Sequence, residues 1–137
     1  MNLDSSAFVA DPDLLAALGK RSTKVLCQED RVLFRQGETS TCLYVLNSGN
    51  ATLTMTSHRG ETIIETVVSA GSLLGLPGFV GNHPYSMTAR AHKGTEVGVV
   101  TREDFSQLML AEPGISLRIL SVLAAEVRSA RAAISED

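Results

Sequence analysis

The residues with the clearest potential for chemistry lie in and after a stretch rich in glycine and proline, residues 71–84. No Asp or Glu occurs between Thr66 and Thr95, whereas His83, Arg90 and Lys93 do. Consecutive backbone amides at Gly75–Gly78 would add hydrogen-bond donors, as amides do where they form an anion-binding concavity. The stretch therefore indicates a site for a small anion. The alternative is a glycine-rich corner that binds no ligand.

The other reactive side chains form no recognisable catalytic or metal-binding pattern. The sequence contains no nucleophile elbow, no H-E-x-x-H motif and no phosphate-binding P-loop. Ser86 lies beside Tyr85 without a base that the sequence reveals. Two cysteines, Cys27 and Cys42, are too few for a disulfide framework or a four-ligand zinc site. We therefore expect no enzyme activity, no bound metal and ordinary thiols in a reducing compartment.

Composition favours a single globular domain. The 137 residues are 44% hydrophobic and 20% charged, which is enough apolar material for one core. With 12 basic and 15 acidic residues the net charge is −3, and DNA binding depends on neutralising phosphates, so we expect no direct nucleic acid binding. The N-terminus lacks a secretory signal, and no run approaches the ~20 apolar residues of a membrane span. These observations predict a cytoplasmic protein that does not enter a membrane.

Short apolar runs separated by turn residues predict a β-rich fold between two helical ends. Pro12 and Gly19 favour a short helix between them. Evenly spaced short strands then predict a barrel or jelly roll. Thr101–Asp104 resembles a capping box, which predicts a helix to about Ala111, and Pro113 can open the next helix. The expected strands are residues 24–27, 31–34, 42–46, 51–56, 61–68, 85–91 and 96–100, with a hairpin turn at 57–60 and a loop at 71–84.

The last helix, expected from Ile115 to about Ile134, has two apolar faces. One face, spaced 3-4-3-4, has the pattern of a coiled-coil seam and predicts a homodimer. A neighbouring stripe would cover the β-roll. The alternative is one wide apolar face docked within the monomer. The predicted dimer interface comprises Leu120, Leu123, Val127, Ala130 and Ile134, and the stripe facing the roll comprises Ile115, Ile119 and Val122.

Three glycine-containing segments resemble the sensor domain of the Crp/Fnr transcription regulators. They are Phe34–Glu38, Leu43–Gly49 and Gly71–Gly75, and the family order of strand and helices continues to Ile134. The resemblance implies a mainly β fold, a double-stranded β-helix or jelly roll of the cyclic nucleotide-binding type, with short flanking helices and a long C-terminal helix. It implies one domain over residues 1–137, with the roll at about 21–100 and the C-terminal helices at about 101–135. Full-length regulators add a helix-turn-helix domain, so a fragment and a stand-alone sensor both remain open.

The resemblance also implies a phosphate-binding cassette between Gly75 and the strand that follows. Nucleotide-binding members have a glutamate and an arginine where this sequence has Leu76 and Tyr85, while Ser86 is kept. Arginine grips a phosphate with two charge-assisted hydrogen bonds, which tyrosine cannot reproduce. Polar residues that touch the base in cyclic AMP sensors fall on Ala130 and Arg131. The candidate pocket therefore comprises Gly75, Leu76, Pro77, Gly78, Tyr85, Ser86, Met87, Ala130 and Arg131.

These features together predict a ligand-sensing regulatory domain with a degenerate cassette and a dimer formed by the last helix. Its small-molecule effector is unidentified. We expect no tightly held cofactor, since the cysteines are too few for an iron–sulfur cluster. A cyclic nucleotide or another small anion remains open as a ligand. The alternatives are a ligand-free dimerisation scaffold and a cyclic nucleotide binder that works despite the altered cassette.

Overall fold

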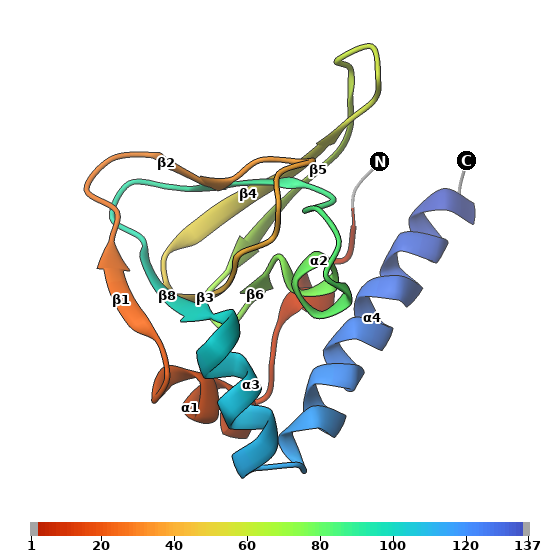
Figure 1. Ribbon diagram of the computed structural model, residues 1–137. Coiled ribbons are helices and arrows are strands. Elements are labelled where there is room, and N and C mark those ends of the chain that lie inside the picture. Colours follow the sequence, from red (N-terminus) through yellow and green to blue (C-terminus); the bar gives the residue numbers. More distant parts are fainter. Residues whose placement is uncertain (1–2, 136–137) are drawn as a thin grey trace.

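The fold is a roll of two four-stranded antiparallel sheets, and the computed structural model describes residues 3–135, with side chains described through Ala133. The strand orders are β1-β8-β3-β6 and β2-β7-β4-β5. The expected mainly β roll with flanking helices is confirmed (Figure 1). The strands are β1 (Thr23–Leu26), β2 (Arg31–Phe34), β3 (Cys42–Ser48), β4 (Asn50–Thr56), β5 (Thr62–Ser69), β6 (Leu73–Leu74), β7 (Thr88–Ala91) and β8 (Glu96–Thr101).

The strand registers follow from which side chains are apolar. In β4, Ala51 and Leu53 point into the roll and alternate with threonines, as the two-residue period of a strand requires. Ala51 pairs with Val68 of β5 on one side and with Ala91 of β7 on the other. The β4–β5 hairpin projects from the body of the roll (Figure 1). Its turn lies at residues 57–60, as predicted from the sequence.

The flanking helices begin at capping residues that the sequence displays. The Asp11 carboxylate accepts a hydrogen bond from the Leu14 amide at 3.0 Å, and Thr101 Oγ1 accepts from the Asp104 amide at 3.1 Å. These side chains satisfy amides that have no partner within the first turn of a helix. Pro113 lies in the turn before the last helix and does not open it. The helices are η1 (Ser5–Phe8), α1 (Pro12–Gly19), α2 (Leu76–Gly81), α3 (Arg102–Ala111) and α4 (Ile115–Ser135).

The segment expected as a loop at residues 71–84 is instead partly regular, containing β6 and α2. Gly75 precedes α2 with a φ of 84°, a left-handed conformation that glycine adopts without strain. Leu76 and Phe79, three residues apart, bury their side chains in the core. This burial outweighs the poor helix propensity of the glycines. The strand expected from Tyr85 begins only at Thr88.

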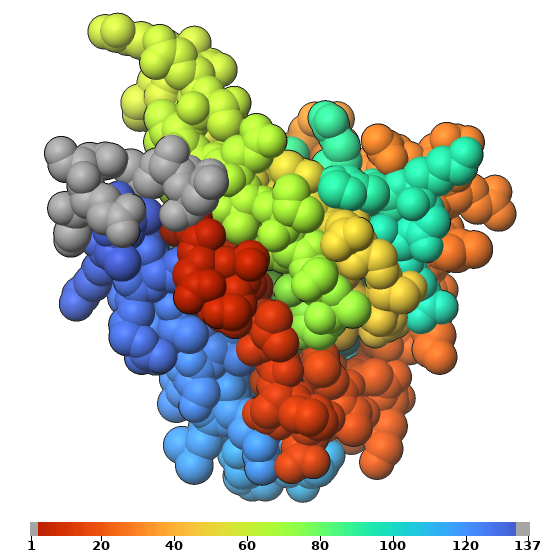
Figure 2. Space-filling view, turned by 180° about the vertical axis from the view of Figure 1, so that it is seen from behind, coloured from red at the N-terminus to blue at the C-terminus, as the bar shows by residue number. Residues whose placement is uncertain are grey.

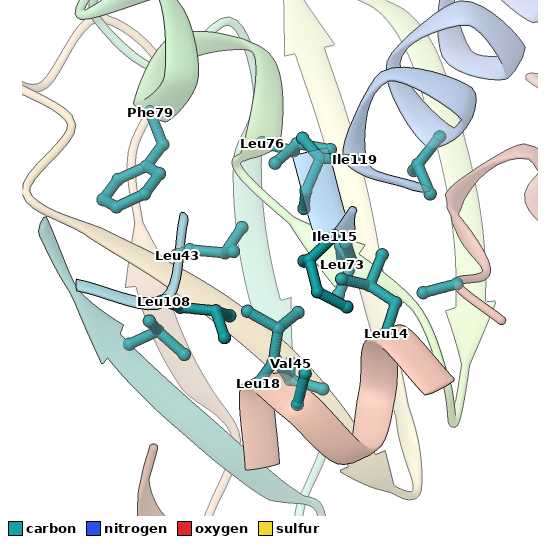
Figure 3. Packing of buried hydrophobic residues seen from close by; sticks show 14 residues of the cluster. Leu14, Leu18, Leu43, Val45, Leu73, Leu76, Phe79, Leu108, Ile115 and Ile119 are labelled. Carbon is teal, nitrogen blue, oxygen red and sulfur yellow. The ribbon is translucent and has the colours of Figure 1, made fainter. Parts of the chain in front are cut away.

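One of two hydrophobic clusters lies between the roll and the helices (Figure 3). It combines side chains from every helix except η1 with side chains of β3, β6 and β8. Its labelled members are Leu14, Leu18, Leu43, Val45, Leu73, Leu76, Phe79, Leu108, Ile115 and Ile119. The second cluster fills the inside of the roll. It includes Phe8, Phe34, Leu46, Leu53, Val68, Leu74 and Tyr85.

An N-terminal segment that the sequence did not predict as structured joins α4 to the roll. The Asp4 amide donates to Ser129 Oγ on α4 at 2.8 Å, and the Leu3 amide donates to Thr66 Oγ1 on β5 at 3.0 Å. Phe8 is buried in the cluster inside the roll. Seen from behind, this red segment runs along the blue α4 (Figure 2). The segment therefore holds α4 against the sheets.

The buried face of α4 is the one predicted to cover the roll, because Ile115, Ile119 and Val122 are all buried. The predicted dimer residues divide into two groups. Leu120 and Val127 are 57% and 53% exposed. Leu123 packs partly against the core, and Ala130 is half-buried. The side chain of Ile134 lies outside the described residues. The homodimer thus stays a prediction.

The two faces of α4 should respond differently to truncation. Ile119→Ala leaves a cavity in the core and should lower the free energy of unfolding by about 2–5 kcal/mol. Leu117→Ala removes a side chain that is 70% exposed, so the change should stay within about 0.5 kcal/mol. Urea unfolding of both variants at low protein concentration measures the difference. Equal losses would contradict the placement of α4.

Candidate functional site

A small cavity lies where the roll, α2, the N-terminal segment and α4 meet. Its volume is about 10 Å³, which holds about one water molecule. The cassette expected from the sequence forms one wall. The lining residues are Phe8, Phe34, Leu53, Gly75, Pro77, Gly78, Tyr85, Ser86, Met87 and Glu126.

Tyr85 fills much of the space beneath the cassette. Its ring stacks on Phe34 with centroids 3.9 Å apart and planes inclined by 19°. Its hydroxyl donates to the Cys42 carbonyl at 2.6 Å and accepts from the Cys42 amide at 3.2 Å. Burial raises the pKa of the hydroxyl above its usual value, so it remains a neutral donor. The tyrosine hydroxyl therefore has backbone partners, as expected for a buried tyrosine.

Gly75 is required by this tyrosine as well as by the backbone turn. A Cβ atom at Gly75 would lie 2.7 Å from Cε1 of Tyr85, closer than real Cβ contacts come. Gly78 is equally confined, since its Cβ would lie 2.8 Å from the Pro84 carbonyl oxygen. Gly75 thus allows the cassette to pack against the aromatic pair, and Gly78 allows α2 to pack against the backbone of residues 83–84.

Leu76 does not line the cavity. Its side chain is fully buried in the core cluster, beside Ile119 of α4 and Leu73 of β6 (Figure 3). Leu76, placed in the candidate pocket from the sequence, is therefore not among the residues that line this cavity. The first turn of α2 directs this apolar side chain toward α4, where burial of a leucine stabilises the fold by roughly 1.5–3 kcal/mol.

The cassette is fastened to α3 by a buried polar network that sequence analysis missed. Arg102 Nη1 donates to the Phe79 carbonyl at 2.8 Å, and Nη2 donates to the Ser40 carbonyl at 2.7 Å. The guanidinium also lies 4.5 Å from the centre of the Phe79 ring. Ser40 Oγ lies 3.0 Å and 2.7 Å from the carbonyl oxygens of Gly78 and His83. Carbonyls at the end of α2 therefore have partners despite being buried.

The sequence analysis missed four lining residues, Phe8, Phe34, Leu53 and Glu126, and Glu126 is the ionisable one among them. It is the sole acidic residue between Ile115 and Ser135. It lies four residues after Val122 and three before Ser129, so it continues the buried stripe of α4. That spacing was the signal available in the sequence. Ala130 and Arg131, placed in the pocket by the resemblance, do not line the cavity.

Burial of Glu126 changes its protonation. Its Oε2 is shut off from solvent and has no hydrogen-bond partner among residues 3–135. Loss of solvent raises the pKa of this carboxyl from 4.5 to about 8, because no neighbouring cation compensates a negative charge. The group is therefore mostly neutral at pH 7. The Glu126 side chain is half-buried as a whole, and a carboxyl oxygen buried without a partner is costly, which sets this residue apart from the others that line the cavity.

The remaining predicted residues lie at the rim or outside the cavity. Pro77 and Ser86 are exposed at its edge, and Met87 is half-buried. His83, Arg90 and Lys93 are exposed and do not line it, so the positive charges expected nearby do not converge on the cassette.

Two larger hollows are open to solvent. One, about 610 Å³, is a groove between the N-terminal segment and α4 that contains no cassette residue. The other, about 480 Å³, is lined by Tyr85 together with Phe34, Tyr44 and residues of the turn after β2. Across the described residues, no cluster of three or more His, Cys, Asp or Glu side chains could hold a metal ion. A search of the same residues found no helix long and apolar enough to cross a membrane. The small cavity beneath the cassette is the best candidate site, because it gathers most of the residues predicted to form the pocket.

Comparison with known families accounts for this arrangement. Residues 24–112 match the family described as cyclic nucleotide-binding domain. The chain belongs to this family. The matched region runs from β1 through α3 and contains the whole cassette. A search of curated proteins gave no match.

Solved structures support the same fold at low identity. The Thermus thermophilus catabolite activator protein is 23% identical with a TM-score of 0.80, covering 91% of this chain and 59% of that one. The N-terminal domain of a transcriptional regulator from Streptomyces coelicolor A3(2) is 23% identical with a TM-score of 0.68. The match covers 93% of this chain and 88% of that one. The sensor domain of the Pseudomonas aeruginosa transcriptional regulator DNR is 22% identical with a TM-score of 0.65, and the match covers 83% of this chain and 77% of that one. The resemblance to Crp/Fnr sensor domains is confirmed, and this chain spans 59% of the length of the Thermus protein.

Glu126 should make stability depend on pH. Its folded-state pKa of about 8 lies above the unfolded value of 4.5, so the folded protein holds the proton more tightly. The free energy of unfolding that this tighter proton binding supplies is fully present below pH 4.5. It is lost as pH rises toward 8, by up to roughly 1.4 kcal/mol per pH unit. Relative to Glu126→Gln, the wild type should lose stability across this window in urea titrations. A constant difference between the two proteins would contradict the buried carboxyl.

Proposed function

We propose that this cyclic nucleotide-binding domain is the sensor part of a Crp/Fnr-type regulator that has lost the usual grip on a cyclic nucleotide. The observation that carries the proposal is the Phe34–Tyr85 stack, which occupies the pocket beneath the cassette. A tyrosine hydroxyl already bonded to the Cys42 backbone has little capacity left for a phosphate. The domain would act by binding and not by catalysis.

The lining of the cavity supports this view of the cassette. No Lys, Arg or His lines it, so no side chain offers a phosphate the charge-assisted pair that arginine forms. Leu76 stands where nucleotide-binding members have a glutamate, and it is buried in the core. Glu126 places a carboxyl in the same cavity, where an ionised group would repel an anion. Cyclic nucleotide binding is disfavoured on each of these grounds.

We propose further that α4 forms a homodimer through its exposed face. Leu117, Leu120, Ala124 and Val127 are exposed and spaced 3, 4 and 3 residues apart, which is the spacing of a coiled-coil seam. This stripe is rotated from the one predicted from sequence, because Leu123 packs partly against the core. A second copy of the helix would cover it symmetrically.

A ligand-free dimerisation scaffold is the second candidate function. The cavity volume of about 10 Å³ favours it, because no nucleotide fits without a rearrangement. The two functions differ in whether a small molecule binds. A sensor would bind one that moves α4 or the cassette away from the roll, whereas a scaffold would bind none.

Cyclic AMP and cyclic GMP should bind the wild-type protein weakly. We expect dissociation constants of hundreds of micromolar or higher, about 5 kcal/mol of binding free energy or less. Isothermal titration with both nucleotides, and with non-cyclic AMP as a matched ligand, measures this. Low-micromolar affinity for either cyclic nucleotide would overturn the degenerate-cassette proposal.

Charges placed on the exposed stripe should separate the dimer. The double variant Leu120→Glu, Val127→Glu should be monomeric in light scattering, since like charges would meet across the axis. The control is Leu26→Glu, Val67→Glu, because those side chains are 60% and 53% exposed on the roll. The control should remain dimeric. A wild-type protein that is monomeric at high micromolar concentration would contradict the proposal.

A further inference from the structure

Glu126 places an acidic side chain in the cassette cavity, which suits a cation and not an anion. It is the only residue with an ordinarily charged side chain among those lining the cavity. Its Oε2 is buried and lacks a hydrogen-bond partner among the described residues. An unpaired buried carboxyl oxygen is favourable only when it is protonated or when a donor binds it.

The other walls suit an organic group that carries a positively charged nitrogen. Phe8, Phe34 and Tyr85 present three aromatic rings, and Met87 adds a flexible thioether. Aromatic faces attract ammonium and guanidinium groups, and sulfur packs readily against apolar ligands. A cation would also make a charge-assisted hydrogen bond with the carboxylate, stronger than any neutral donor can make.

Resting on the proposed sensor function, we propose that the pocket takes a small organic cation, an amine or guanidinium group, whose nitrogen donates to the Glu126 carboxylate. Glu126 is then the residue that determines specificity at this site. In this proposal the ligand is a cation held by α4, where nucleotide-binding members of the family hold a phosphate at the cassette.

Binding must separate α4 from the cassette or displace the Phe34–Tyr85 stack. The cavity holds about one water molecule as described, so a larger group needs additional room. Glu126 lies on the same helix as the exposed residues Leu120 and Val127. A ligand held by Glu126 therefore acts directly on the helix proposed to form the dimer. This connection gives the pocket a route to a regulatory output.

The protonation of Glu126 predicts how binding depends on pH. The cation binds the carboxylate, whereas burial raises the pKa of the carboxyl to about 8. Below that pH, binding must first remove a proton, so affinity should fall by about tenfold for each pH unit. Among the described residues, Tyr85 is the other titratable side chain on the lining. The remaining walls contribute Phe8 from η1, Phe34 from β2 and Leu53 from β4, none of which titrates.

The test uses the full chain and probes that differ only in charge. Benzylamine and phenylguanidine are the cations, benzyl alcohol is the neutral analogue and benzoate is the anion. Thermal shift and the NMR signal of the Met87 methyl group report binding at millimolar concentrations. The Glu126→Gln variant keeps the shape and removes the charge, while Glu61→Gln changes an exposed glutamate on the β4–β5 hairpin. Methylammonium tests a cation of minimal size.

We expect one or more of the cations to raise the melting temperature and shift the Met87 signal near pH 8. Glu126→Gln should weaken that binding about tenfold or more, and Glu61→Gln should match the wild type. Affinity should fall between about pH 8 and pH 6, in line with the pKa of Glu126 of about 8. Failure of every cation to bind, equal binding by Glu126→Gln, or preference for benzoate would overturn the inference. Tight binding of a cyclic nucleotide would instead overturn the proposed function.

Discussion

The packing beneath the cassette depends on how Tyr85 is held. Its ring is fixed from one side by Phe34, and its hydroxyl is fixed by both backbone groups of Cys42 at the start of β3. Because Gly75 leaves no side chain in the way, the cassette packs directly onto the ring. The space that would receive a ligand thus belongs to the hydrophobic cluster inside the roll. Any ligand has to compete with that packing.

The polar groups around the cassette serve the fold and leave little for a ligand. Arg102 donates to the Phe79 and Ser40 carbonyls, and Ser40 lies against two further carbonyls of the same segment. These bonds tie α2 to the start of α3 and so to the turn that leads into α4. The cassette is therefore linked to the long helix through these bonds and the chain of α3. Hydrogen bonds from a charged guanidinium are among the stronger ones, so they help to hold this arrangement.

Helix α4 performs two tasks with different faces. Its apolar stripe, Ile115, Ile119 and Val122, completes the core, and the N-terminal segment holds the same helix through Ser129. Glu126 extends that face with a carboxyl whose unpartnered Oε2 makes its packing against the roll costly. A helix docked by apolar contacts but carrying one poorly satisfied polar group is held less tightly than a fully apolar face would hold it.

The sequence by itself determined the class of fold, because glycines at tight corners and alternating apolar residues impose local conformations. The strands from Thr23 to Ser69, the short helix between Pro12 and Gly19 and the buried face of α4 were all predictable in this way. Helix α2, the inward direction of Leu76 and the docking of Phe8 were not. They arise from contacts between segments distant in sequence, which override weak local preferences. Only the tertiary structure brought Glu126 to the cassette, since its protonation and its neighbours are set by burial between α4 and the roll.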